Sequence, residues 1–518
     1  MKGSLLIRHW PAAWAVAAFS MLPVLYFAKS NTAELKVSEA AELGLFALVF
    51  SGIVWAAARL ALRGWTKGAL FAIAATFPAY HYVSWSGFIA EHLPFLPPTP
   101  ALYGTIILFL ALILVLLRRT SPPRARMLTN YFAVLGTVLV LMNLVPAVRD
   151  FIRTTQVGVT VHNEDFVRAA ADADLPDDPP DIYYIVLDRY TGQLGLKERF
   201  GFDNAPFVET LRGKGFYVAD ASFANYPITA PSLASSLNAG LLEAHGPVEE
   251  INNRKPLHEL VERPQVVRSL QEKGYEYALI GSWWGPTQQS PIADVNPEFA
   301  WNVELPGWRL HTGNAAGHFY TDTIFAGVFE QLGSDYTAAK AHGPIFGEQL
   351  TEVRRQAERQ DGTPKFVLAH ILMPHPPYVF DAAGRRIPAS YAGDDRYVQQ
   401  LRYTNREMDR LMDGILAAYP KDRKPVIVLA GDEGEYTYRF DPSAPDEQIR
   451  YKTNILNAFY FPGEDYGSLY PTITPVNAFR VVFNEFFGTD LSLLPDRTTA
   501  SPSKRPLHWV DVTDRVRR

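Results

Sequence analysis

The chain has 518 residues, of which 48% are hydrophobic and 20% are charged, and its formal net charge is −5. Such a length exceeds one ordinary core and predicts at least two folding units. Cysteine is absent, which excludes disulfides, thiolate metal ligands and a cysteine nucleophile. The mild charge, with no basic patch interleaved with aromatic residues, gives no sign of a nucleic-acid partner.

Five apolar stretches lie in the first third of the chain, and each is about 17–23 residues long, close to the ~20 residues of helix that a bilayer core requires. The stretches are Pro11–Ala28, Leu43–Leu62, Gly68–Ala90, Ala101–Leu117 and Met127–Val148. Five in succession, none with an amphipathic stripe, favour membrane spans over buried core helices of a soluble protein. The sequence therefore predicts a five-helix transmembrane domain over residues 1–150.

The distribution of Lys and Arg predicts the orientation of these spans. Basic residues precede the first span and occupy the loops after the second and fourth, whereas the alternate loops hold only Lys29 and Lys36. Because basic loops stay in the cytoplasm, we expect a cytoplasmic N-terminus and an extracytoplasmic region after Val148. The expected location is a bacterial-type inner (plasma) membrane, crossed several times.

The remainder of the chain has the pattern of an α/β domain. Residues 151–180 end in DADLPDDPP and predict a linker. From Asp181 onward, short apolar runs that suit buried strands alternate with helical segments, which predicts a doubly wound domain over residues 181–518. The expected strands are Tyr183–Leu187, Phe216–Ala219, Tyr275–Ile280, Phe366–Leu372 and Val426–Ala430, and the expected helices are Ala205–Arg212, Pro264–Lys273 and Arg396–Ala418.

Two of the expected strands end in acids. Asp188 follows Tyr183–Leu187 directly, and Asp432 and Glu433 come just after Val426–Ala430. Ligands of open α/β sheets bind beyond the carboxyl ends of the strands, so these acids are candidates for one metal site. Adjacent acids repel each other unless a positive charge such as a divalent cation compensates. The alternatives are a turn or cap aspartate at position 188 and a solvated acidic turn at position 432.

A hydroxyl-rich segment, ITAPSLASSLNAG at residues 228–240, is typical of a loop that opens a helix. Thr229 would lie near the helix N-terminus, where free N–H groups and the helix dipole favour an anion. A nucleophilic hydroxyl at that place would lie beside a bound phosphoryl or sulfuryl group. Alternatively, Thr229 or Ser232 serves as a simple N-cap.

Two histidines occur in FVLAHILMPHPPYVF, residues 366–380. His375 lies between prolines after the strand, where the fixed backbone can direct its imidazole toward a site. His370 lies within the strand, so it either reaches the same site or is a satisfied histidine of the core.

These segments together resemble the sulfatase and alkaline-phosphatase superfamily, in the branch of membrane-anchored lipoteichoic acid synthases and phosphoethanolamine transferases. The resemblance covers most of Asp181–Gly488 and rests on the order and spacing of YIVLDRY, TAPSLASSLNAG, HPPY, YTNREMD, LAGDEGE and NAFYFP. It implies an alkaline-phosphatase-like extracytoplasmic domain with Thr229 as the nucleophile. It also implies a metal site made of Asp188, Thr229, Asp432 and Glu433.

The chain departs from the family pattern in three places. Arg189 stands where sulfatases commonly have a second acid. Leu233 replaces the signature arginine, and GSWW at residues 281–284 replaces Gly-Lys-Trp-His, so a sulfate pocket would lack cationic groups. Glu433 replaces the usual histidine; an all-oxygen site would prefer manganese, magnesium or calcium to zinc, or the site is weakened or lost.

The expected function is transfer of a phosphoryl-linked group, of the phosphoglycerol or phosphoethanolamine type, from a membrane lipid to an envelope glycan or lipid. Thr229 would attack phosphorus with the help of one divalent metal ion, which is manganese, magnesium, calcium or zinc. The candidates for substrate contact are His375, His370, Arg189, Trp283 and Lys452. Two alternatives stay open: a phosphate or sulfate ester hydrolase on the same fold, and a non-catalytic membrane protein that has lost the metal site.

Overall fold

The computed structural model describes residues 3–31, 35–92, 98–299, 302–305, 308–311, 319–320, 323–324, 338–390, 394–435, 441–463 and 465–517. The chain forms two compact units, the first made of Met1–Ile152 with Trp301–Ala338 and the second of Arg153–Ala300 with Ala339–Arg518. The first unit thus includes a segment from inside the region expected to be catalytic. Most of the expected linker, in contrast, folds with the second unit.

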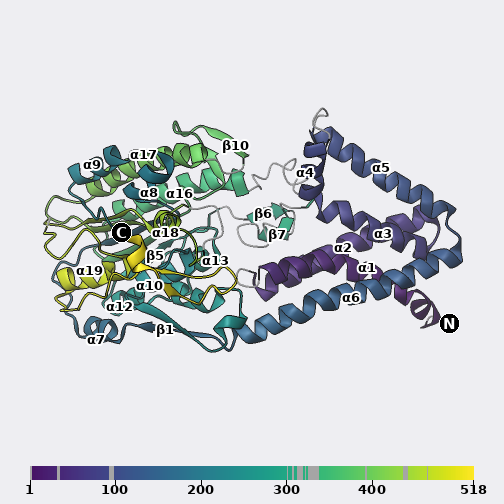
Figure 1. The fold of residues 1–518 in the computed structure, drawn as a ribbon, viewed down its shortest axis with the longest axis horizontal. Coiled ribbons are helices and arrows are strands. Elements are labelled where there is room, and N and C mark those ends of the chain that lie inside the picture. Colours follow the sequence, from purple (N-terminus) through teal and green to yellow (C-terminus); the bar gives the residue numbers. More distant parts are fainter. Residues whose placement is uncertain are drawn as a thin grey trace. The chain divides into compact units, whose positions relative to one another are not determined.

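The first unit is a set of apolar helices (Figure 1). They are α1 (Gly3–Ser30), α2 (Val37–Leu62), α3 (Trp65–Tyr80), α4 (Tyr82–His92), α5 (Pro98–Arg119) and α6 (Pro122–Thr154). Within the described residues, four helices are long and apolar enough to cross a membrane, in α1, α2, α5 and α6. The third expected span, Gly68–Ala90, is instead two helices that meet at His81, three residues after Pro78. Proline lacks the N–H that would continue the helical hydrogen bonds, which favours such a break.

The segment from the middle of the chain packs on these helices. Phe319 and Tyr320 are buried in one apolar cluster with residues of α1, α2 and α3. The N–H of Ile324 donates to the carbonyl of Ala79, at 2.8 Å. A two-stranded antiparallel ribbon, β6 (Asn302–Leu305) and β7 (Trp308–His311), belongs to the same unit.

The second unit is built on a six-stranded sheet with the order β3-β12-β11-β2-β8-β5. The strands are β2 (Ile182–Leu187), β3 (Tyr217–Val218), β5 (Glu276–Ile280), β8 (Lys365–Ile371), β11 (Val426–Gly431) and β12 (Asn457–Tyr460). β11, β2, β8 and β5 run parallel, and β12 and β3 complete the sheet as antiparallel strands. Every residue of β2, β8 and β11 is buried, as expected for strands that are covered on both faces.

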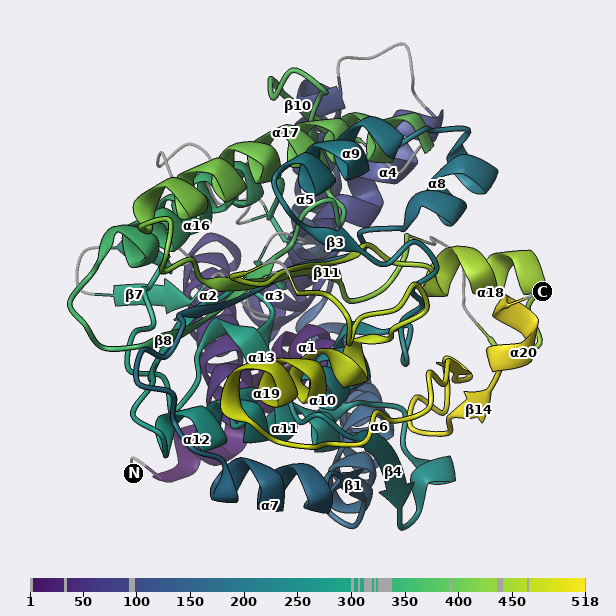
Figure 2. The ribbon, with the colours of Figure 1, turned by 90° about the vertical axis from the view of Figure 1, so that its left-hand side faces the viewer.

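Helices cover both faces of this sheet, which confirms the expected doubly wound α/β fold. Figure 2 shows α16, α17 and α9 on one face and α10, α12 and α19 on the other. The helices of this unit are α7 (Glu164–Asp172), α8 (Gln193–Phe200), α9 (Ala205–Gly213), α10 (Thr229–Ser236), α11 (His258–Glu262), α12 (Gln265–Gln271), α13 (Gly285–Gln288), α16 (Ala338–Glu358), α17 (Asp394–Ala418), α18 (Asp446–Thr453), α19 (Ala478–Phe487) and α20 (Thr513–Val516). Among the residues that the structure describes, this unit also has three small antiparallel ribbons: β1 (Gly158–His162) with β4 (Leu241–His245), β9 (Tyr378–Phe380) with β10 (Arg386–Ser390), and β13 (Thr499–Ala500) with β14 (Val510–Asp511).

One fully buried arginine ties the expected linker to the core. Arg480 of α19 donates to both carboxylate oxygens of Asp165 in α7, each at 2.7 Å. The same guanidinium donates to the carbonyls of Ala239 at 3.0 Å and Ser492 at 2.8 Å. Two elements of the expected linker, β1 and α7, are therefore part of the second unit.

We expect Arg480→Ala to lower the free energy of unfolding of the second unit by about 3 kcal/mol, because it creates a cavity and leaves buried carbonyls unpaired. Pulse proteolysis of the full chain in urea measures this change. Arg355→Ala is the matched control: its side chain is 58% exposed, and surface changes of this kind shift stability by less than about 0.5 kcal/mol. An equally small change for both variants would contradict this role of Arg480.

Candidate metal centre and active site

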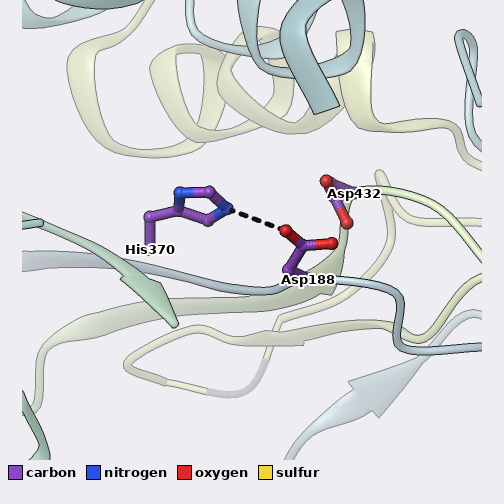
Figure 3. Close-up of side chains that lie close together, drawn as sticks. All are labelled: Asp188, His370 and Asp432. Carbon is purple, nitrogen blue, oxygen red and sulfur yellow. Dashed lines mark ion pairs between the residues drawn. The ribbon is translucent and has the colours of Figure 1, made fainter. Parts of the chain in front are cut away.

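The parallel sheet brings the two acid-tipped strands together around a third strand end. β2 lies between β11 and β8, with Leu187 opposite both Gly431 and Ile371. Asp188 and Asp432 are therefore the first residues beyond adjacent strand ends. His370 projects from β8 one residue before that strand ends. Figure 3 shows the three side chains facing one another.

Asp188, His370 and Asp432 form a compact group of potential metal ligands. Each residue offers one ligand atom, and these atoms all lie within 4.8 Å of one another. Nε2 of His370 is 3.9 Å from Oδ2 of Asp188. Oδ1 of Asp188, Oδ2 of Asp432 and Nε2 of His370 are buried without a hydrogen-bond partner. Because unpaired buried polar atoms are uncommon in native proteins, the three residues fit a divalent cation that would satisfy all of them.

The other nitrogen of His370 is held by two hydroxyls. Nδ1 lies 2.7 Å from Oγ1 of Thr287 and 3.2 Å from Oγ of Ser282. Burial lowers the pKa of His370 to about 3, so its ring is neutral, the form that binds metals. A metal-binding histidine usually has a partner on its second nitrogen that fixes the ring orientation, and Thr287 and Ser282 are suited to that role.

Thr229 is the first residue of α10 and is only partly buried. Its hydroxyl lies close enough to the Asp432 carboxylate to lower the pKa of that group through a side-chain hydrogen bond. Ser232, one turn later, donates to the main-chain carbonyl of Asp432 at 2.8 Å. These contacts place the N-terminus of α10 against the end of β11, so the structure brings Thr229 to the carboxylate cluster.

Two cations and two further acids surround the group. The main-chain N–H of Arg189 donates to Oδ1 of Asp432 at 3.0 Å, from a left-handed backbone with φ of 60° that a non-glycine residue seldom adopts. Nε of Arg189 lies 3.2 Å from Oε1 of Glu433, and one terminal nitrogen lies 3.4 Å from Oε2 of Glu435. Nζ of Lys452 is 2.6 Å from the same Oε1 of Glu433.

Burial and mutual repulsion raise the pKa values of the two aspartates. The pKa of Asp188 is well above its ordinary value because the carboxylate is buried and faces Asp432 and Glu433. Burial, followed by the charge of Glu433, raises the pKa of Asp432 to about 7. Each side chain would be held in its ionised form by a metal cation, since an opposite charge at close range favours the carboxylate.

Three other residues expected in the site, Glu433, His375 and Trp283, are not members of the Asp188–His370–Asp432 group. Glu433 follows Asp432; its Oε1 is paired with Arg189 and Lys452, and its Oε2 is buried without a hydrogen-bond partner. His375 is partly buried in the turn after β8, where Gln400 donates to its carbonyl at 3.1 Å. Trp283 is partly buried in the loop between β5 and α13. Neither His375 nor Trp283 belongs to the three-residue group.

Glu435, Ser282 and Thr287 contact the site residues without being predicted from the sequence. Glu435 is visible in the GDEGE segment as a third acid after β11, so the sequence carried a signal for it. Thr287 contacts a histidine that lies 83 positions later in the chain, and no local pattern could have linked the two residues.

The chain belongs to the sulfatase family, because residues 181–481 match the Sulfatase family model. It is an enzyme of this superfamily, and the intact Asp–His–Asp group accords with that conclusion. No curated protein matches the chain at the level of sequence.

The fold resembles several solved structures at low sequence identity. The C-terminal periplasmic domain of EcEptC from Escherichia coli is 11% identical with a TM-score of 0.40, over 66% of this chain and 94% of that one. The corresponding domain of phosphoethanolamine transferase EptC from Campylobacter jejuni is 11% identical with a TM-score of 0.37, over 61% and 91%. Phosphonate monoester hydrolase of Agrobacterium radiobacter is 13% identical with a TM-score of 0.34, over 62% and 79%.

The raised pKa of Asp432 predicts how stability depends on pH. A carboxyl group whose pKa is higher in the folded than in the unfolded protein stabilises the fold at low pH, where it is protonated. This stabilisation is lost as the pH rises through the pKa of the folded protein, which is about 7 for Asp432. The metal-free protein should therefore have a lower melting temperature at pH 8 than at pH 6, whereas added Mn²⁺ or Zn²⁺ should stabilise it more at pH 8. Thermal unfolding of the full chain in EDTA and in metal measures both effects.

Asp432→Asn is the control for this pH dependence, because its side chain keeps the shape and cannot ionise. The variant should lose part of the pH-dependent difference and most of the metal effect. An identical pH profile and an identical metal shift in the variant would contradict the assignment of Asp432.

Proposed function

We propose that this chain is a membrane-bound, metal-dependent transferase that moves a phosphoryl-linked group, of the phosphoglycerol or phosphoethanolamine type, from a lipid donor to an envelope acceptor. The observation that carries the proposal is the position of Thr229. Its hydroxyl lies at the start of α10, beside Asp432 in a buried Asp–His–Asp group.

In this proposal Asp188, His370 and Asp432 hold one divalent metal ion, and the Thr229 hydroxyl lies next to it. When bound, the metal neutralises charge that develops in the transition state and lowers the pKa of a nearby hydroxyl. One imidazole with two carboxylates suits zinc or manganese better than magnesium or calcium. The nitrogen ligand comes from position 370, so Glu433 is not required as a ligand.

Thr229 acts as the nucleophile. Its hydroxyl is hydrogen-bonded to the Asp432 carboxylate, which would take up the hydroxyl proton as the oxygen attacks phosphorus. The bond from phosphorus to the donor oxygen breaks, and the donor leaves as an alcohol with the proton that Thr229 gave up. The transferred group stays on Thr229 as a phosphodiester until the acceptor hydroxyl attacks phosphorus, and the acceptor's proton then restores the Thr229 hydroxyl. The N–H groups at the start of α10 favour the phosphate anion at this position.

Substrate contacts are proposed for the cations at the rim of the site. The Arg189 side chain is 23% exposed while its guanidinium stays paired with buried acids, so it can reach a phosphate oxygen from a fixed position. Lys452 lies deeper, with 6% of its side chain exposed. His375 and Trp283 are proposed to contact the leaving group and the rest of the substrate.

The apolar helices are proposed to tether the second unit to a membrane. By the distribution of Lys and Arg, the N-terminus is proposed to be cytoplasmic and the second unit to lie outside the membrane. A catalytic unit tethered in this way meets a membrane-confined donor at high local concentration. The same site would hydrolyse esters if water replaced the acceptor, so hydrolysis is the second candidate function.

A covalent group on Thr229 is the direct test. Intact-mass and peptide analysis of the full chain, purified from membranes and incubated with lipid extract, should show an adduct on Thr229. Thr229→Ala should show no adduct and should lose at least about a thousandfold in turnover, as for loss of a nucleophile. Thr229→Ser keeps a hydroxyl and should still form the adduct.

The mass of the adduct identifies the transferred group, and its fate separates the two candidates. Transfer to an added alcohol supports the transferase, and release to water alone supports the hydrolase. An adduct of equal yield in Thr229→Ala would contradict the nucleophile assignment.

A further inference from the structure

Six charged side chains of the described part of the chain form the candidate metal centre or are linked to it. Four are acids, Asp188, Asp432, Glu433 and Glu435, and each is at most 4% exposed. Two are cations, Arg189 and Lys452, which are linked to the acids by ion pairs. His370 adds no charge, because burial lowers its pKa to about 3.

Glu433 and Glu435 hold both cations before any substrate arrives. Oε1 of Glu433 is shared by Arg189, at 3.2 Å, and Lys452, at 2.6 Å. Glu435 takes a second nitrogen of Arg189, at 3.4 Å. Oε2 of Glu433 and Oε1 of Glu435 are buried without a hydrogen-bond partner, and the two carboxylates together match the two cations in charge.

The turn that carries these acids is built against the backbone of Lys452. The N–H of Gly434 donates to the carbonyl of Lys452 at 2.7 Å. A side chain at Gly434 would collide with the carbonyl of Tyr451, so only glycine allows this close approach. The N–H of Glu435 donates to Oγ1 of Thr191 at 2.7 Å. Glu433 and Glu435 are therefore fixed relative to the cations.

The charges balance once a divalent ion is present. Ligand carboxylates bind a metal in their ionised form. The ion then contributes two positive charges and the two side-chain cations contribute two more, which balance the four negative charges of the carboxylates. A phosphodiester brings one negative charge to such a site. A phosphate monoester carries about −1.5 to −2 at pH 7, so it leaves more uncompensated charge in a poorly solvated site, where each unit charge matters most.

We propose that Glu433 and Glu435 are positioning residues that neutralise Arg189 and Lys452 and thereby select monoanionic esters over dianionic phosphate monoesters. This inference rests on the proposed function of the site. Two classes of ester carry a single negative charge, phosphodiesters and sulfate monoesters, and their relative turnover distinguishes them.

The test compares three chromogenic substrates at pH 8 with the full chain in detergent: bis(p-nitrophenyl) phosphate, p-nitrophenyl phosphate and p-nitrophenyl sulfate. Glu433→Gln should keep one metal ion per chain and raise the monoester-to-diester ratio of kcat/KM by about tenfold or more, the effect of one uncompensated charge. Glu435→Gln should change the ratio in the same direction. Turnover of the sulfate by the wild type, but not of the diester, would assign the monoanion to sulfate.

A double variant separates charge balance from the loss of a particular side chain. Glu433→Gln with Lys452→Gln removes one acid and one cation, so the ratio should return to within about threefold of the wild type even though both rates fall. Glu209→Gln is the matched surface control, because its carboxylate is 65% exposed, and it should leave the ratio unchanged.

Two results would overturn the inference. Loss of the metal in Glu433→Gln would show that Glu433 is a metal ligand. An unchanged monoester-to-diester ratio of kcat/KM in both single variants would show that these acids do not select substrates by charge. If the wild type turns over none of the three substrates and Thr229 carries no adduct, the proposed function fails separately. Calorimetric binding of inorganic phosphate to the metal-loaded chain then decides the inference: it should tighten by about tenfold in Glu433→Gln, and equal binding would overturn it.

Discussion

The repulsion among buried carboxylates at the end of a parallel sheet is the constraint on which the rest of the site depends. β2 and β11 are neighbours in register, so Asp188 and Asp432 must lie close together whatever their charge. Glu433 and Glu435 follow on the same turn, and all four acids are buried. Such a cluster is stable only if protons, protein cations or a metal ion offset the charge. This chain supplies two cations and leaves ligand atoms unpaired for a third.

The acids that can be read from the sequence are those at strand ends, because a buried strand followed by an acid is a local pattern. This pattern predicts Asp188 and Asp432 as candidate ligands, together with the strands and the α/β fold. For His370 the sequence allows either a core histidine or a substrate contact, because its role depends on which strands are neighbours. The pairing of β8 with β2 places Nε2 of His370 toward Asp188. No spacing along the chain encodes that pairing.

The role of Glu433 also depends on neighbours that are distant in the sequence. Its position after Asp432 predicts a metal ligand. In the structure its Oε1 is paired with Arg189, from the turn after β2, and Lys452, from α18, while its Oε2 is buried without a hydrogen-bond partner. An acid next to a cation acts differently from an acid next to a metal, and only the fold reveals which neighbour it has. The break at His81 and the packing of Phe319 on the apolar helices also depend on tertiary contacts that local composition does not report.

Anomalous X-ray scattering from crystals of the full chain grown with Mn²⁺ or Zn²⁺ tests the central claim most directly. The account predicts one strong peak within bonding distance, about 2.0–2.2 Å, of Nε2 of His370 and of carboxylate oxygens of Asp188 and Asp432. It also predicts that Glu433 keeps its contacts with Arg189 and Lys452 and lies outside the coordination sphere. A peak bonded to Glu433 and distant from His370, or no peak at saturating metal, would contradict it.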